Sequence, residues 1–418
     1  MSRLKTLAIA FDSNTNVFSS GDVISGQVIV QVDSNRDQEG LKNVQGIWVK
    51  FKGKAKTKWT TTEHRTDSNG HGHSETRTHT KKERYFDTIF VIFGKGKHQR
   101  SANKLNIPPG THAYPFSFQL PTGMLPSPFE HKYGYVRYKV KTTLSLIRTF
   151  SNKTFKREKL FSVTGPMVDL NLIPQAQSGV ERTKELVNCC GCGSTVEESI
   201  TVGLPKQGYV PGESIYLTGH VDNRDREESC DFYAKFMQRI TFYSKSSKTK
   251  HVENILGAVG VRVATPRGRV KDFSMGPILI PPVPPTGLPG CNIIDIEYSI
   301  QCKGDNGKLK FPIVIGTVPL RARTPASLPT APPASMPYPS AIATAPASMP
   351  YPSAIATAPD YPKAMAASAP PFGDEPPPPS YEEAVGKTDR LANARNDEDY
   401  VIDDQFVPSY PYFNLLVD

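Results

Sequence analysis

The sequence lacks several features that would place the protein outside the cell or within a membrane. It has only 6 cysteines in 418 residues, irregularly spaced, which excludes the dense disulfide framework of a small secreted domain. No apolar run approaches the length that spans a bilayer. The first residues, Met1–Lys5, lead into an expected strand without the apolar core of a signal peptide. We therefore expect a cytoplasmic protein with reduced thiols and, at most, peripheral membrane contact.

The sequence also lacks the motifs that mark most enzymes. It contains no nucleophile elbow, no cofactor fingerprint and no hydrolase-type spacing of metal ligands. We therefore expect no catalytic site, no cofactor and no metal site. Four histidines fall in a segment rich in Thr, Ser, Gly and charge, which we expect to be a loop between strands: His64, His71, His73 and His79.

Three of the few cysteines are clustered, as Cys189, Cys190 and Cys192. Adjacent cysteines do not supply the separated pairs of ligands that a structural zinc site needs. Two interpretations stay open for this cluster: reversible S-palmitoylation, or no chemical role.

No segment has the pattern of a long amphipathic helix. Instead, apolar and polar residues alternate in segments that are bounded by turn residues. This pattern is typical of antiparallel β-sandwiches, so we expect an all-β fold. The clearest strand covers residues 48–59, in which Val49, Phe51, Ala55 and Trp59 share the face expected to be buried.

The opposite face of the same strand is a ladder of positive charge, formed by Lys50, Lys52, Lys54, Lys56 and Lys58. Like charges at this spacing repel unless anions or acidic neighbours offset them. The ladder is either a solvated strand face or a contact for acidic or phosphorylated protein segments or anionic lipid. Because the aromatic residues lie on the other face, where they cannot stack bases beside phosphate contacts, we do not expect nucleic acid as a partner.

Two pairs of similar segments, which occur in the same order in each half of the chain, predict a duplicated domain. The turn at residues 20–22 and its following strand resemble the turn at residues 211–213 and its strand. Residues 136–140 resemble residues 296–300, and each of these segments follows a proline-rich stretch.

We predict two β-sandwich domains, residues 1–170 and 181–322, with a linker around residues 174–179. Residues 323–418 are expected to be a disordered, proline-rich tail, because the region after Leu320 holds 19 of the 38 prolines and too little apolar surface to fold.

The net charge of +10 is unevenly distributed between these parts. Residues 321–418 hold 6 of the 50 basic and 12 of the 40 acidic residues, which leaves 44 basic and 28 acidic residues in the body. Such a basic body suggests acidic partners, or only a soluble, lysine-rich surface.

The tail carries a PPxY sequence, formed by Pro378, Pro379, Ser380 and Tyr381. Consecutive prolines favour the polyproline helix, so the segment loses little entropy when it docks in the aromatic groove of a WW domain. The alternative is an idle spacer.

Two further tail sequences resemble binding motifs more loosely. Pro408 and Tyr410 belong to Val-Pro-Ser-Tyr, which lacks the first proline and is a weak or decayed second site. The segment Tyr412–Leu415 loosely fits a tyrosine-based sequence for clathrin adaptors.

In their order and joint presence, these segments resemble the arrestin domain-containing proteins, or α-arrestins. The resemblance covers most of residues 4–322 and the PPxY sequence, and it is carried by Phe18–Gly26, Tyr114–Pro121, Pro128–Glu130, Val136–Tyr138, Tyr209–Ile215, Ile280–Pro285, Cys291–Tyr298 and Pro312–Leu320. Many relatives have two PPxY motifs, whereas this chain has one complete motif.

The resemblance implies two tandem arrestin-like β-sandwiches that act as an adaptor at the plasma membrane and endosomes. It implies that residues 378–381 recruit WW-domain HECT ubiquitin ligases, and that membrane-protein cargo such as receptors and transporters is then ubiquitinated, endocytosed and sorted. The alternative is a ligase-independent trafficking scaffold that binds a coat or a membrane, like the arrestin-fold subunit of retromer.

Overall fold

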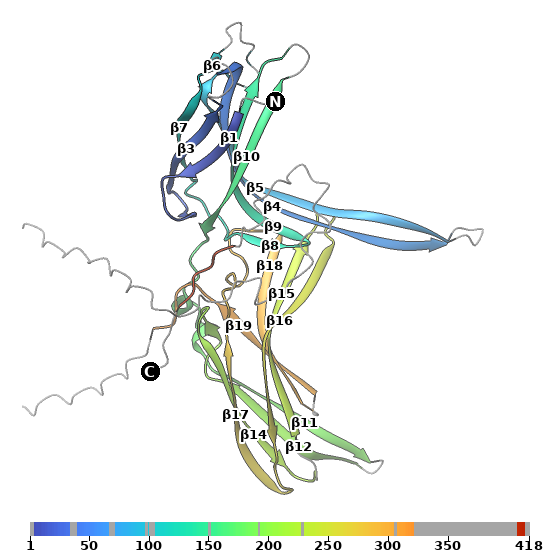
Figure 1. The fold of residues 1–418 in the computed structure, drawn as a ribbon. Helices are drawn as coiled ribbons and strands as arrows, with labels where there is room; N and C mark the ends of the chain where they lie inside the picture. The colour runs from blue at the N-terminus through green and yellow to red at the C-terminus, as the bar shows by residue number, and fades with distance from the viewer. Residues whose placement is uncertain are drawn as a thin grey trace, which may run out of the picture. The chain divides into compact units, whose positions relative to one another are not determined.

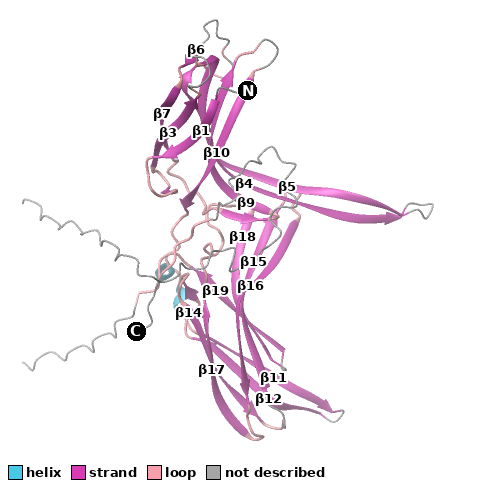
Figure 2. Cartoon of the chain, in the orientation of Figure 1, coloured by secondary structure: helices cyan, strands magenta, loops and turns pink. Residues whose placement is uncertain are grey.

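The computed structural model describes residues 4–33, 40–66, 72–96, 99, 105–148, 152–190, 193–226, 230–304, 307–321 and 408–413. Almost all secondary structure in these residues is β-strand, with one short α-helix (Figure 2). The expected all-β class, with two tandem β-sandwiches, is therefore confirmed. No helix in the described residues is both long enough and apolar enough to cross a bilayer.

The first sandwich packs two sheets against each other (Figure 1). One sheet has the order β1-β3-β7, from β1 (Leu4–Phe11), β3 (Val23–Val32) and β7 (Gly110–Gln119). The other has the order β2-β10-β9-β4-β5, from β2 (Val17–Ser19), β10 (Lys153–Thr164), β9 (Gly134–Leu146), β4 (Leu41–Thr66) and β5 (Gly72–Gly94). Two short strands extend it: β6 (Leu105–Ile107) pairs with β4, and β8 (Phe129–His131) pairs with β9.

The second sandwich repeats this strand order with one added edge strand in its smaller sheet. Its smaller sheet runs β11-β12-β14-β17, from β11 (Val180–Cys190), β12 (Gly193–Leu204), β14 (Ser214–Asn223) and β17 (Arg269–Leu279). Its larger sheet runs β13-β19-β18-β15-β16, from β13 (Gly208–Tyr209), β19 (Gly307–Ile315), β18 (Ile294–Gly304), β15 (Cys230–Tyr243) and β16 (Thr249–Val263). In both sandwiches the first strand of the larger sheet pairs in parallel with the last, as β2 with β10 and β13 with β19.

The two pairs of similar segments occupy equivalent positions in the two sandwiches. The first pair is the turn that precedes β3 and the turn that precedes β14. Gly21 and Gly212 both adopt positive φ, of 85° and 98°, where a side chain would be strained. The carboxylate after each glycine accepts a hydrogen bond from the backbone N–H three residues earlier, Ser19 to Asp22 at 2.6 Å and Val210 to Glu213 at 3.0 Å.

The second pair of similar segments, residues 136–140 and 296–300, makes the same buried hydrogen bond in each sandwich. The Tyr138 hydroxyl donates to the carbonyl oxygen of Pro126, and the Tyr298 hydroxyl donates to that of Pro284, each at 2.7 Å. Both acceptors lie in the proline-rich stretch that precedes the tyrosine strand. The domain duplication expected from the sequence therefore extends to individual hydrogen bonds.

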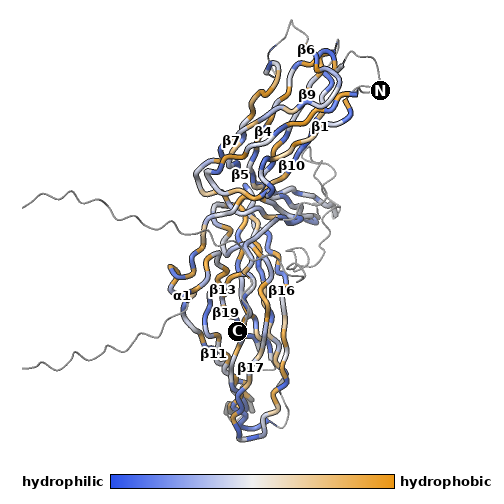
Figure 3. Tube along the Cα trace, turned by 60° about the vertical axis from the view of Figure 1, so that its left-hand side comes forward, coloured by the Kyte–Doolittle hydropathy of each residue, from blue (hydrophilic) through white to orange (hydrophobic). Residues whose placement is uncertain are grey.

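Strand β4 has the two faces that its alternation predicts. Phe51 and Ala55 are fully buried and Trp59 is 5% exposed, so the apolar face forms core. Figure 3 shows the same alternation of hydrophobic and hydrophilic residues along the other strands.

The histidine-rich segment is strand rather than loop, which corrects the sequence-based expectation. β4 continues to Thr66 and β5 begins at Gly72, so His64, His73 and His79 lie in a two-stranded hairpin. His71 lies outside the described residues. Many residues of this segment are threonine, whose β-branched side chain favours extended backbone. His79 is held in register because its ring stacks on Trp59 with centroids 5.4 Å apart.

The expected linker between the sandwiches contains the only α-helix of the described residues. A 3₁₀ turn, η1 (Leu170–Leu172), precedes the one-turn α1 (Pro174–Gln177). Leu170 and Ala176 are fully buried and, with Val210, form a small apolar cluster separate from the main core.

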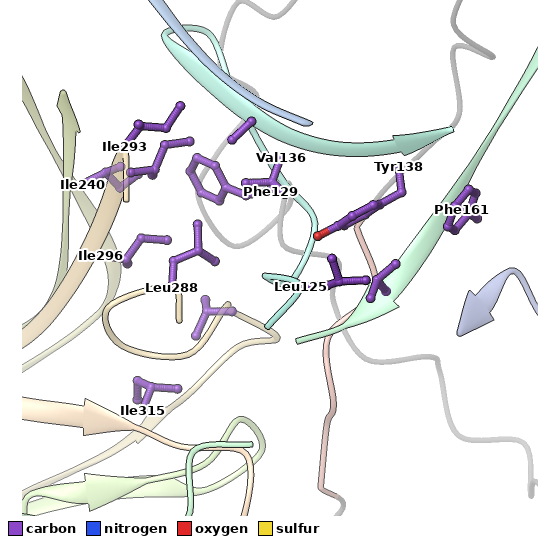
Figure 4. Packing of buried hydrophobic residues seen from close by; sticks show 14 of the residues in the cluster. Leu125, Phe129, Val136, Tyr138, Phe161, Ile240, Leu288, Ile293, Ile296 and Ile315 are labelled. Carbon is purple, nitrogen blue, oxygen red and sulfur yellow. The ribbon is translucent and has the colours of Figure 1, made fainter. Parts of the chain in front are cut away.

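Residues of both sandwiches belong to one continuous apolar cluster (Figure 4). Phe129 and Val136 lie on one side of this junction, and Ile240 and Ile293 lie on the other. Direct hydrogen bonds also join the sandwiches, from Thr57 Oγ1 to the Tyr243 carbonyl at 2.7 Å and from Asn292 to Glu83 at 2.8 and 2.9 Å.

Candidate functional site

Lysines from three adjacent strands line a hollow of about 600 Å³ on the face of the larger sheet that points away from the core of the first sandwich. Lys50 and Lys52 come from β4, Lys139 and Lys141 from β9, and Lys156 from β10. We call this site the lysine hollow. Its other lining residues are Gln45, Trp48, Ile89, Thr143, Ser145, Asn152, Thr154 and Glu158.

Strand register brings the lysines together. Lys50 lies directly opposite Lys141, and Lys52 lies directly opposite Lys139, across the antiparallel pair β4–β9. Like charges that face each other across two strands destabilise a sheet. This arrangement therefore requires neighbouring negative charge, from the protein or from a ligand.

Asp87 on β5 supplies part of that charge. Its carboxylate lies 2.6 Å from Lys50 Nζ and 3.8 Å from Lys52 Nζ. Partial burial by itself would raise the pKa of Asp87, but the hydrogen bond and charge of Lys50 outweigh it and hold the pKa below its usual value. The carboxylate is therefore ionised at neutral pH.

Glu158 on β10 supplies negative charge to the two lysines of β9, as Asp87 does to the two lysines of β4. Its two oxygens lie 2.6 Å from Lys141 Nζ and 2.9 Å from Lys139 Nζ. Burial favours a raised pKa for Glu158, but the two lysines outweigh burial and lower that pKa. Because half-buried pairs are screened less than exposed ones, these contacts stabilise the sheet as well as fix the lysine side chains.

The hollow therefore keeps an excess of positive charge. Five lysines surround it, against the two carboxylates of Asp87 and Glu158. Lys156 has an exposed side chain, and the polar groups of Asn152 and Thr154 lie beside it on β10 or just before it. Such a concave, cationic surface is suited to an anionic ligand.

The remaining lysines of the predicted ladder lie outside the lysine hollow. Lys54 Nζ lies over the Tyr135 ring, 5.4 Å from its centroid. Lys56 is only 6% exposed, and Lys58 lies on the exposed surface. β4 pairs with β9 without a shift through Lys54 and Lys56, so the alternation holds while the surroundings of these lysines change along the strand.

The ladder predicted from the sequence contains only two of the five lysines in the hollow. Lys139 and Lys141 alternate with the buried residues Tyr138 and Val140, so the period-two signal was present in the sequence. Their position opposite Lys50 and Lys52 depends on strand pairing across about ninety residues, which alternation alone does not specify.

The predicted WW-binding residues Pro378, Pro379, Ser380 and Tyr381 lie outside the described residues. The weaker second motif is partly described. Pro408 is buried, and the Tyr410 hydroxyl donates a hydrogen bond to the Pro128 carbonyl oxygen at 2.9 Å. In the tail expected to be disordered, the segment Pro408–Phe413 therefore packs on the body.

Two other predicted features are only partly within the described residues. In the clathrin-adaptor-like sequence, Tyr412 and Phe413 are half-buried. Cys189 and Cys190 end β11, whereas Cys192 lies outside the described residues, and S-palmitoylation of this cluster stays a prediction. No group of three or more His, Cys, Asp or Glu residues within the described ranges is placed to hold a metal ion.

Comparison with known families matches both sandwiches. The family model described as "Arrestin (or S-antigen), N-terminal domain" matches residues 7–171, and "Arrestin (or S-antigen), C-terminal domain" matches residues 198–320. Arrestin domain-containing protein 17 of Caenorhabditis elegans is 28% identical over 326 residues, which cover 76% of this chain and 72% of that protein. This chain belongs to the α-arrestin family.

Two human relatives have a similar sequence identity to this chain. Arrestin domain-containing protein 4 is 26% identical to this α-arrestin over 324 residues, which cover 76% of the chain and 72% of the relative. Arrestin domain-containing protein 1 is 28% identical over 269 residues, 61% of the chain, and the match spans only 57% of that relative. The resemblance drawn from the sequence motifs is confirmed.

Family membership gives the general function. Arrestin-family proteins are adaptors and scaffolds rather than enzymes, so this α-arrestin is a non-enzymatic trafficking adaptor that binds cargo and partner proteins. The lysine hollow and the docked C-terminal segment are the candidate contacts for such partners in the part of the chain that the structure describes.

Proposed function

We propose that this α-arrestin recruits WW-domain HECT ubiquitin ligases to membrane-protein cargo, so that the cargo is ubiquitinated, endocytosed and sorted at endosomes. The observation that carries the proposal is the complete PPxY sequence at residues 378–381, joined to two tandem arrestin domains. Pro378 and Pro379 pack on the aromatic groove of the WW domain, and Tyr381 fills the adjacent pocket.

The mechanism is proximity. The body, divided at residues 1–170 and 181–322, holds the cargo, while the tail of residues 323–418 holds the ligase. Tethering raises the effective concentration of ligase at the cargo. A long, proline-rich connection lets the ligase reach lysines at varied distances. The adaptor acts peripherally at the plasma membrane and endosomes.

The lysine hollow is the proposed contact for acidic or phosphorylated segments of cargo. Its support is the five lysines on three strands, the excess of positive charge, and the hydrogen-bonding groups beside Lys156. Charge-assisted hydrogen bonds from several fixed ammonium groups favour a phosphate or carboxylate cluster over neutral peptide.

The test compares ubiquitinated membrane proteins in cells that express the wild-type chain or Pro379→Ala/Tyr381→Ala. The matched control is Pro337→Ala/Tyr338→Ala, which removes a proline and a tyrosine from the same tail without touching the PPxY sequence. We expect a set of surface proteins to lose ubiquitin and persist at the membrane only with Pro379→Ala/Tyr381→Ala. Unchanged ubiquitination and sorting with that variant would contradict the proposal and favour the ligase-independent scaffold.

A further inference from the structure

The C-terminal segment Pro408–Phe413 contacts the body at two points far apart in sequence. The Tyr410 hydroxyl donates to the Pro128 carbonyl oxygen of the first sandwich at 2.9 Å. The Phe413 backbone N–H donates to the Pro211 carbonyl oxygen beside the second sandwich at 3.0 Å. Tyr410 also packs against the main apolar core. The segment is therefore held by specific contacts at Tyr410 and at Phe413.

The contact at Phe413 involves both backbone and side chain. A Cβ atom at Gly212 would overlap the Phe413 carbonyl group, so only glycine at this turn allows the tail backbone to approach. The Phe413 side chain packs against the apolar cluster of Leu170, Ala176 and Val210, each of which is fully buried. Burial of an aromatic ring is among the larger favourable terms available to a short segment.

The contact at Tyr410 depends on the chemistry of a proline-rich stretch. Proline has no backbone N–H, so Pro126 and Pro128 offer only carbonyl acceptors. The Tyr138 hydroxyl already binds the Pro126 carbonyl at 2.7 Å, while the Pro128 carbonyl accepts the hydroxyl of Tyr410. The body thus presents an acceptor for a tyrosine hydroxyl, an acceptor for a backbone N–H and an apolar cluster for the ring three residues later.

The docked segment also brings the two ends of the tail together. Leu320, near the end of the body, and Phe413, near the end of the tail, pack against the same apolar cluster. The PPxY sequence at residues 378–381 lies in the chain between these two anchors.

We propose that Pro408–Phe413 is a docking segment and that the surface formed by Pro128, Pro211–Gly212 and the cluster around Val210 is its binding site on the body. The site recognises a tyrosine followed three residues later by phenylalanine. While the segment is docked, the body engages the Tyr410 ring and hydroxyl, so a WW domain does not reach the Val-Pro-Ser-Tyr motif.

A labelled synthetic peptide of residues 406–418 tests the site in trans on the full-length chain, up to about 1 mM, the range of effective concentration for a tethered segment. In the wild-type chain the attached segment occupies the site. We expect at least tenfold tighter peptide binding to Tyr410→Ala/Phe413→Ala, and no change with Ser409→Ala, whose side chain is exposed. The peptide phosphorylated on Tyr410 is expected not to bind, because phosphate removes the hydroxyl proton and adds negative charge.

Hydrogen exchange of the C-terminal peptide measures docking in cis. The Phe413 amide is expected to exchange more slowly in the wild type than the residue 413 amide does in Tyr410→Ala/Phe413→Ala. Equal exchange in the two chains, or equal peptide affinity for them, would overturn the proposal. The variant Tyr381→Ala is expected to match the wild type in both assays, so the result does not depend on ligase recruitment.

Discussion

The imidazole of His131 in the first sandwich stacks on the ring of Phe242 in the second, with 5.0 Å between the ring centroids. The Tyr133 backbone N–H donates to His131 Nδ1, so the imidazole proton is on Nε2. Nε2 is buried and has no hydrogen-bond partner among the described residues. Burial, with a smaller contribution from the charge of Lys132, lowers the pKa of His131 to about 4. The junction between the sandwiches therefore contains a histidine that stays neutral.

This histidine predicts a loss of stability on acidification. Its pKa is about 4 in the folded chain and 6.5 as a model value, so its full contribution is present above pH 6.5 and is lost as the pH falls toward 4. The free energy of unfolding should fall by about 2 kcal/mol between pH 6.5 and 5. Urea unfolding across this range is the measurement. His131→Phe keeps the ring contact and removes the titration, and parallel pH profiles for the two chains would contradict the assignment.

The lysine hollow predicts that lysines inside it and lysines outside it contribute differently to the binding of an acidic ligand. Lys50→Ala/Lys141→Ala should weaken binding of an acidic phosphopeptide by roughly tenfold, because two charged hydrogen-bond donors are lost. Lys54→Ala/Lys58→Ala removes the same charge outside the hollow and is the matched control. Fluorescence anisotropy at two salt concentrations is the measurement. Equal weakening by both double variants would mean that net charge alone binds the peptide.

The paired tyrosines predict a loss of stability in each sandwich when either hydroxyl is removed. Tyr138→Phe leaves the buried carbonyl of Pro126 without its donor, and Tyr298→Phe does the same to Pro284. Tyr298→Phe also removes the hydroxyl that accepts from the buried Gln238 Nε2 at 3.2 Å. Each substitution should cost about 1–2 kcal/mol of unfolding free energy. Urea unfolding of the two single variants is the measurement. A loss confined to one of them would show that the repeated hydrogen bond has different weight in the two domains.

The sequence predicted the features that depend on local pattern. Alternation in β4 correctly identified Phe51 and Trp59 as core. The two pairs of similar segments identified a duplication that includes the hydrogen bonds of the Tyr138 and Tyr298 hydroxyls. Such patterns report which face of a strand is buried, because successive side chains point to opposite faces.

Features that depend on distant pairing were not predicted. Two of the five lysines in the hollow come from β9, and only Lys50 and Lys52 of the predicted ladder line it, neither of which follows from alternation. The contact of Tyr410 with Pro128 joins residues 282 positions apart, so no local signal indicates it. The same motif that the sequence presents as a weak WW ligand is held by the body.

We expect that release of the docked segment from the body increases the affinity for the ligase. Phe413→Ala removes the ring from the apolar cluster and leaves the Val-Pro-Ser-Tyr motif intact, so a tandem WW protein gains a second contact. Its affinity for the full-length chain should rise several-fold through effective concentration. Phe413→Ala/Tyr410→Ala should show no rise. A rise in both variants would mean that Tyr410 is not the second WW contact.

Direct titration of the full-length chain with a single purified WW domain from a HECT ligase tests the central claim. We expect binding by the wild type and by Pro337→Ala/Tyr338→Ala. We expect a loss of at least about tenfold in affinity with Pro379→Ala/Tyr381→Ala, because the groove and pocket contacts are both removed. Undiminished binding by Pro379→Ala/Tyr381→Ala would contradict the proposal that residues 378–381 recruit the ligase.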